Sequence, residues 1–289
     1  NGVLKVTYNL GSLNAAETVT RICASADAGG YLANAGVSYL HVNPYIAFDE
    51  SEMMKNYHQG PIVTEGLVLA MDAGNLVSYE SGSSSVNSLV GEVKGTLVNG
   101  VGYDNEYGGS WVFDGTDDNI NTDFTIPAGN RSMDLWIKYD TLSSSGGGGY
   151  SLTGVQQSGG KYLYTGITSN GVGYSYAGDT GGSYDYTFSA GVWYHLATVM
   201  DSGTTRHYVN GVQVATRTYT NSVASTTPVM IGAINSQHEV DGSIPITRIY
   251  NKALTVAEVV QNYNATRNRF ESVAPNPIET DGEWLKVFR

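Results

Sequence analysis

The chain has 289 residues, a formal net charge of −12 at pH 7 and only 15% charged residues, and it contains 36 glycines and 21 tyrosines. Nucleic-acid binding depends mainly on basic side chains that neutralise phosphates, so this acidic balance argues against a DNA or RNA partner and against anionic membrane surfaces. No apolar run approaches the roughly 18 residues that a membrane-spanning helix needs, so we expect no membrane insertion. Because Cys23 is the only cysteine, packing rather than an intramolecular disulfide must hold the fold together.

Residues 1–62 differ in composition from the rest of the chain and predict a small α+β extension. Residues 3–8 are β-prone, and residues 49–57 predict a short helix, since Asp49 and Glu52 have the spacing of a capping box. We expect this extension to attach the protein to its neighbours, either as a separate domain or as an arm.

From residue 63 onward the pattern changes to short β-prone runs separated by turns. The clearest runs are residues 66–72, 110–115, 132–138, 193–200, 228–232 and 246–250. Asn210-Gly211 stands between two further β-prone runs and predicts a hairpin, because a type I′ turn needs positive φ at both central residues. Many short strands joined by close turns are typical of an all-β antiparallel sandwich.

The end of the chain predicts a short helix followed by a tail. Thr255 and Glu258 have the spacing of a second capping box, ahead of a helix over residues 258–264. The predicted domain therefore covers residues 63–270, and residues 271–289 form a C-terminal tail. An apolar run in this tail could be an edge strand of the same domain or could add to another chain.

The order of these motifs resembles the laminin-G-like branch of the concanavalin-A-like lectin/glucanase fold. The segments that carry the resemblance are residues 66–75, 113–118, 193–195, 208–211, 241–244 and 253–264. The resemblance implies a two-sheet antiparallel jelly-roll sandwich over roughly residues 63–270. One departure is Pro245, which stands where such domains usually carry an acidic residue. Proline lacks the ladder donor and fits only an edge or a bulge, so we expect no acidic ligand near this strand.

The same combination also resembles virion structural proteins of tailed bacteriophages. Residues 60–63 lead into the domain and residues 267–270 close it in the same manner. This resemblance implies a capsid decoration or tail-fibre component at the virion surface, with other virion proteins or copies of itself as partners. The alternative is a secreted or surface lectin or adhesin module in the extracellular space, with cell-surface glycans as its partner.

Catalysis has to be considered because the same fold hosts glucanases. Retaining glycosidases need two carboxyl groups about 5 Å apart. The glucanase branch supplies them as Glu-x-Asp-x-x-Glu, and no such run occurs in this sequence. We therefore expect a non-enzymatic protein with no catalytic residue and no required cofactor.

Three acidic residues, Asp114, Asp117 and Asp118, surround Gly115 and Thr116 and offer a possible metal site. Calcium prefers carboxylate and loop-carbonyl oxygens, which this run provides. A polar turn capped by aspartate side chains explains the same residues without a metal. The sequence is compatible with both a calcium site and a turn without metal.

Tyrosine forms the most distinctive pattern in the chain. Three pairs at i and i+2 occur in successive β-prone segments: Tyr162 and Tyr164, Tyr174 and Tyr176, Tyr184 and Tyr186. Residues two apart on a strand share a face, so three adjacent strands could present six tyrosines together. Such a face could stack sugar rings, or it could serve ordinary cross-strand packing or a subunit interface.

Overall fold

The computed structural model describes residues 61–142, 150–151, 153–157, 161–178, 180–219, 227–233 and 238–271. These residues lie in one of the two compact units into which the chain divides, residues 51–289. The expectations for residues 1–60 and 272–289 fall outside the described residues, so the proposed domain boundaries stay predictions.

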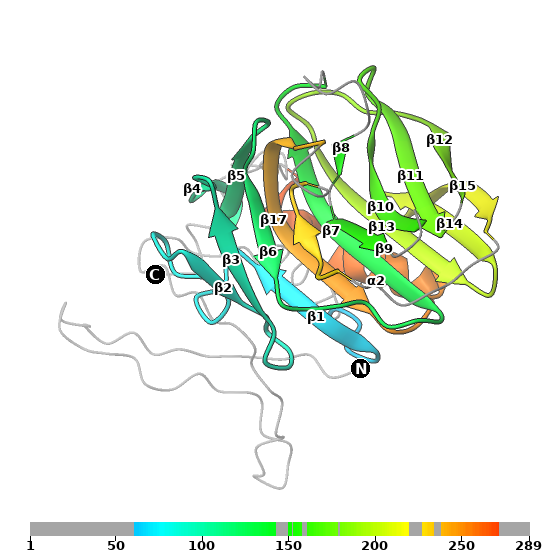
Figure 1. The fold of residues 1–289 in the computed structure, drawn as a ribbon, viewed down its shortest axis with the longest axis horizontal. Coiled ribbons are helices and arrows are strands. Elements are labelled where there is room, and N and C mark those ends of the chain that lie inside the picture. Colours follow the sequence, from blue (N-terminus) through cyan, green and yellow to red (C-terminus); the bar gives the residue numbers. More distant parts are fainter. Residues whose placement is uncertain are drawn as a thin grey trace, which may run out of the picture. The chain divides into compact units, whose positions relative to one another are not determined.

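The described residues form two antiparallel sheets (Figure 1). The first has eight strands, in the order β15 (Val212–Thr218), β14 (Thr204–Val209), β13 (Trp193–Asp201), β7 (Arg131–Tyr139), β17 (Asp241–Tyr250), β5 (Ser110–Asp114) and β4 (Gly102–Asp104), with β1 (Leu67–Asp72) also paired to β17. The second has nine strands, in the order β12 (Thr180–Thr187), β11 (Val172–Gly178), β10 (Lys161–Ile167), β9 (Thr153–Gln157), β16 (Met230–Ile231), β6 (Asn119–Thr122), β3 (Lys94–Val98) and β2 (Ser85–Asn87), with β8 (Tyr150–Ser151) also paired to β10. The predicted all-β antiparallel sandwich is confirmed.

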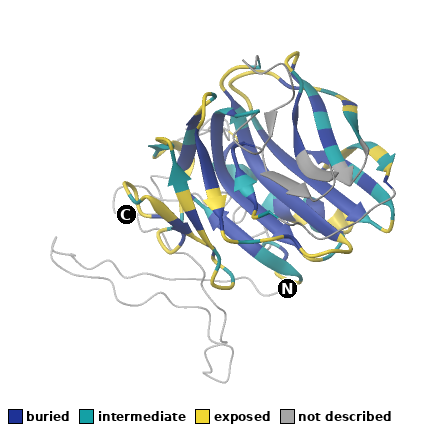
Figure 2. Ribbon diagram, viewed as in Figure 1, coloured by how far each residue is buried: buried dark blue, intermediate teal, exposed yellow. Residues whose placement is uncertain are grey.

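The core lies between the two sheets. Its apolar side chains come from both, among them Phe113 of β5 and Leu135 of β7 from the first sheet, and Ile120 of β6 and Ile231 of β16 from the second. Contact is close enough that a side-chain carbon at Gly232, directly after β16, would lie 2.4 Å from the Phe113 ring. The central strands are accordingly buried along most of their length (Figure 2).

Strand β7 is buried on both of its faces, so the outer face of the first sheet is covered at this strand. Helix α2 (Val256–Thr266) covers the outer face of the first sheet, where Val259 and Leu254 pack against Tyr250 and Val199. The helix begins at Thr255, whose side chain accepts from the Glu258 backbone while the Glu258 carboxylate accepts from the Thr255 backbone, so the predicted capping box is confirmed. Two short 3-10 turns, η1 (Glu106–Gly108) and η2 (Arg267–Arg269), complete the elements of the described residues.

The other local predictions hold as well. Asn210 and Gly211 have φ values of 50° and 78° and connect β14 to β15, as a type I′ hairpin requires. Pro245 lies within the central strand β17, where the register against β7 shifts between Ser243 and Ile246. Along its other side, β17 changes partner from β5 to β1 at this same residue. The proline therefore occupies a bulge, as its missing donor demands.

None of the helices in the described part of the chain is long and apolar enough to cross a membrane.

Candidate functional site

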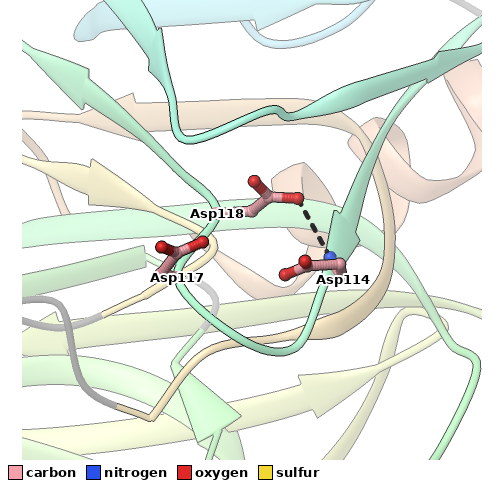
Figure 3. A group of neighbouring side chains, drawn as sticks. All are labelled: Asp114, Asp117 and Asp118. Atoms are coloured by element: carbon pink, nitrogen blue, oxygen red, sulfur yellow. Dashed lines mark hydrogen bonds between the residues drawn. The ribbon is translucent and has the colours of Figure 1, made fainter.

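The loop between β5 and β6 brings Asp114, Asp117 and Asp118 together (Figure 3). Gly115 adopts a φ of 71° and turns the chain sharply. Asp114 Oδ1 accepts a hydrogen bond from the Thr116 backbone at 2.8 Å, and Asp118 Oδ2 accepts one from the Asp114 backbone at 3.1 Å. One oxygen from each of the three carboxylates lies within 4.8 Å of the other two.

Asp118 is the buried member of this group. Its side chain is only 3% exposed, and its Oδ1 has no hydrogen-bond partner among the described residues. Burial raises the pKa of Asp118, and the nearby carboxylates of Asp114 and Asp117 raise it further, against the opposing effect of the Asp114 backbone donor. Asp117 is exposed, but its backbone carbonyl is fixed by the side-chain amides of Asn99 and Asn119 at 2.9 and 3.0 Å.

The three carboxylates of this loop are oxygen ligands of the kind that bind a hard metal ion such as calcium. Calcium lies 2.3–2.6 Å from each of its oxygen ligands, so oxygens on opposite sides of the ion are up to about 5 Å apart. The spacing of the three carboxylates fits that limit. The spacing is also near that of the two carboxyl groups of retaining glycosidases, and two of the three aspartates, Asp114 and Asp117, are exposed.

The six tyrosines divide between the two faces of the second sheet. Tyr184 is 5% exposed and lies in the core, where burial raises its pKa to about 12. Tyr186 also points into the sandwich, against the rings of Phe188 and Tyr194. The six residues therefore do not form one common face, and Tyr184 and Tyr186 serve the packing that was one of the two alternatives.

Tyr174 and Tyr176 lie on the outer face of β11, because Ser175 between them is buried. Tyr164 of β10 is the direct partner of Tyr176 of β11, Tyr174 is opposite Gly166, and Tyr162 is opposite Gly178. Tyr174 and Tyr176 are half-buried. A side-chain carbon placed at Gly181, the partner of Tyr176 on β12, would lie 2.1 Å from the Tyr176 ring. The ring therefore lies against the glycine backbone of the neighbouring strand.

A buried polar cluster beneath α2 was not foreseen from the sequence. Asp134 of β7 is fully buried and accepts from Arg248 Nε at 2.6 Å and from the Asn262 side-chain amide at 2.6 Å. Burial alone would raise the pKa of Asp134, but Arg248 and His195 lower it to about 2. The same burial lowers the pKa of His195, whose Nε2 lies 3.6 Å from Asp134. The signal in the sequence is one acidic residue, Asp134, placed among the apolar residues 133–137 of β7.

Asn262 shows what this cluster does. Its side chain donates to Asp134 and to the Tyr250 hydroxyl, and its Oδ1 accepts from the Val63 backbone at 2.8 Å. The cluster thus fixes α2 and the segment around Val63, where the predicted domain begins, to the outer face of the first sheet. It is shielded from solvent, so we assign it to the fold and not to ligand binding.

A shallow hollow of about 590 Å³ lies elsewhere, at the edge formed by β2 and β3. Its lining includes Ser88, Glu92, Lys94 and Asp123. None of the residues predicted as site residues lines it.

The family comparison identifies the fold. A family model described as the concanavalin A-like lectin/glucanases superfamily matches residues 114–260, which is half of the chain. The chain belongs to this family. A search of curated protein sequences found no match.

Solved structures with similar folds are distant in sequence. They include a mutant Trypanosoma rangeli sialidase displaying trans-sialidase activity, at 15% identity and a TM-score of 0.57, covering 73% of this chain and 34% of that chain. Domain 4 of AbnA, an extracellular arabinanase of Geobacillus stearothermophilus in complex with arabinotriose, matches at 19% identity and a TM-score of 0.52, covering 68% of this chain and 98% of that chain. The binding domain of Paraclostridial Mosquitocidal Protein 1 matches at 16% identity and a TM-score of 0.56, covering 70% of this chain and 53% of that chain. The chain spans about a third of the sialidase, so this likeness concerns one part of that enzyme.

These comparisons correct one expectation. The prediction that the protein is not an enzyme is wrong, because it rested on one missing carboxylate run, whereas the family is described as containing glucanases as well as lectins. Similar folds also occur in a sialidase and in an arabinanase. The missing Glu-x-Asp-x-x-Glu run excludes one arrangement of carboxylates, whereas glycosidases use several.

Proposed function

We propose that the domain binds carbohydrate on the outer face of β10, β11 and β12. The observation that carries this proposal is the position of Tyr176, whose ring lies against Gly181 and has Tyr174 two residues away on the same face. Aromatic rings on a sheet face can stack on sugar rings, while a tyrosine hydroxyl can hydrogen-bond. Tyr164 and Tyr162 occupy the register positions on β10 opposite Tyr176 and Gly178.

The comparisons support the choice of ligand class. The family includes lectins, and the arabinanase domain that this chain covers almost completely has arabinotriose bound. Arabinotriose is therefore the first probe, followed by sialylated and β-glucan oligosaccharides.

The test is calorimetric titration of these sugars into the full chain and its tyrosine variants. Replacing Tyr176 or Tyr174 with alanine should weaken binding about fivefold or more, since an aromatic contact contributes about 1 kcal/mol. Tyr176→Phe keeps the ring and should retain more affinity than Tyr176→Ala. Tyr107→Ala, a change at a tyrosine that is 44% exposed on η1, is the matched control and should bind as the native protein does. Loss of binding in the control alone would move the site to η1.

Hydrolysis is measured on the same samples because the family includes glucanases. Binding without release of reducing sugar would define a binding module. Release that disappears in the Tyr174 and Tyr176 variants would make the same face an active site. No binding of any sugar by the native chain contradicts the proposal.

The place where this domain works is a separate question. A tailed-phage virion stays the prediction from the sequence, with an extracellular lectin or adhesin as the alternative. Immunogold labelling of purified particles with an antibody against residues 63–270 tests it. Label on heads would support capsid decoration, label on tail tips would support a tail fibre, and unlabelled particles would contradict the virion placement.

A further inference from the structure

We propose that residues 284–288 of the C-terminal tail bind an apolar patch beside η1 on the same chain. The patch consists of Leu76, Val77, Tyr107, Val192 and Trp193. Seven large apolar side chains are exposed in the described part of the chain, and four of them belong to this patch. Exposed apolar side chains that gather at one place mark interaction sites, whereas scattered ones need no explanation.

Tyr107 is held in the patch at a conformational cost. Its φ of 52° is in the left-handed region, which a bulky side chain rarely adopts. Arg269 fixes this turn, since its guanidinium donates to the Tyr107 carbonyl oxygen and, at 2.7 Å, to the Asp72 carboxylate. The Tyr107 ring thereby lies edge-on to the Trp193 ring, with centroids 5.5 Å apart. Backbone strain of this kind occurs mainly where a side chain is placed for function.

The loop after β1 brings two more apolar side chains to η1. A side-chain carbon at Gly74 would meet the Gly108 carbonyl oxygen at 1.9 Å, so the two backbones are in direct contact. Leu76 and Val77 follow on this loop and are 84% and 74% exposed. The patch is therefore built from three segments that are far apart in the sequence: this loop, η1 and the start of β13.

The C-terminal tail leaves the domain at this patch. Phe270 packs on Trp193 with ring centroids 5.0 Å apart, and the described residues end at Glu271, directly after it. Residues 272–283 then connect the domain to the apolar run at 284–288. Each residue of an extended chain spans up to about 3.3–3.6 Å, so this connection is long enough to return to the patch. A short connection also keeps the run at a high local concentration there.

The composition of the tail fits the patch. Residues 284–288 read Trp-Leu-Lys-Val-Phe, and tryptophan and phenylalanine are enriched in the cores of interfaces. Three acidic residues precede this run, at positions 279, 281 and 283. A cation stands at the patch, since Lys138 Nζ lies 5.5 Å from the centroid of the Trp193 ring. Opposite charges beside an apolar contact favour one orientation of the bound segment.

The experiment measures cleavage of the full chain by trypsin after Lys286, followed by mass spectrometry of the released residues 287–289. Cleavage tracks the fraction of molecules in which the run is unbound. Tyr107→Ala should speed this cleavage about fivefold, because it removes an aromatic contact. Tyr107→Phe keeps the ring and should stay close to the native rate. Leu76→Ser tests the patch from its second segment and should also speed cleavage.

The matched control is Val212→Ala, at an apolar side chain that is 66% exposed on β15 and lies outside the patch. It should be cleaved as the native chain is. The native rate should not depend on protein concentration, because the run binds within one chain. Three results would overturn the proposal: equal rates in the native chain and both patch variants, an equal increase in Val212→Ala, or protection that rises with protein concentration, which would place the tail on a second copy. The patch includes no residue of β10, β11 or β12, so either outcome leaves the proposed carbohydrate site untouched.

Discussion

His207 and Tyr184 lie face to face in the core, with ring centroids 4.8 Å apart and ring planes within 3° of parallel. His207 belongs to β14 of the first sheet and Tyr184 to β12 of the second, so this pair joins the two layers. The imidazole also lies within hydrogen-bond reach of Ser175 at 3.0 Å and of Thr198 at 3.3 Å. A neutral imidazole has one donor and one acceptor, which two hydroxyls can satisfy together.

The first prediction is that acid destabilises the domain through His207. Burial, followed by the nearby charge of Arg217, lowers the pKa of His207 to about 3. An unfolded chain takes up this proton near pH 6.5, whereas the folded chain does not until about pH 3. The free energy of unfolding should therefore fall by about 1.4 kcal/mol per pH unit below pH 6.5 on account of this residue.

Chemical denaturation at several pH values between 7.5 and 4.5 measures this slope. His207→Gln keeps hydrogen-bonding capacity without the titration and should show a shallower slope. Identical slopes in the two proteins would mean that His207 does not carry the acid sensitivity.

The second prediction concerns the anchor of α2. Asp134→Asn leaves Arg248 buried without its carboxylate, and breaking a buried pair commonly costs about 3–5 kcal/mol. Asp140→Asn removes an exposed partner of Lys138, which lies 3.5 Å away, and should cost less than about 1 kcal/mol. Urea unfolding of both variants compares them, and a similar small loss in each would show that the buried cluster does not hold the helix.

The third prediction concerns the capping box of the same helix. Thr255→Ala removes the acceptor of the Glu258 backbone and should destabilise the protein by about 1 kcal/mol. Thr255→Ser keeps the hydroxyl and should stay close to the native stability. Thermal unfolding monitored by circular dichroism distinguishes them, and equal midpoints would show that the cap is dispensable.

The fourth prediction concerns the stability of the loop between β5 and β6. Asp118→Asn should raise the free energy of unfolding by about 1 kcal/mol, because it removes a buried charge next to two carboxylates and keeps an oxygen for the Asp114 backbone. Urea unfolding of the variant and of the native chain measures this difference. A variant that is less stable than the native chain would show that the Asp118 carboxylate does not destabilise the loop.

Local signals explain which parts of the fold were predictable. The Asn210-Gly211 hairpin and the Thr255–Glu258 cap depend on neighbouring residues alone, and both occur as expected. The closeness of Asp114, Asp117 and Asp118 is likewise local, since one tight turn brings them together. The burial of Asp118 was not predictable, because it depends on a loop about Asn99 and Gly100 that the sequence does not connect to it.

Strand register explains why the tyrosine pattern was only partly predictable. Spacing of two places each pair on one face of its own strand, but the pairing decides how neighbouring strands align. Tyr174 is opposite Ser183, so the outward positions of β12 are odd-numbered there and Tyr184 points inward. The register between β11 and β12 also shifts between Val172 and Tyr174, which spacing along the sequence does not reveal.

The most direct test of the account is to map the bound sugar on the protein. Backbone amide chemical shifts would be recorded by NMR while the tightest-binding oligosaccharide of the screen is titrated in. The account predicts that the perturbed amides cluster on β10, β11 and β12, with Tyr174, Tyr176 and Gly181 among them. Perturbations confined to the first sheet, or none at saturating sugar, would contradict it.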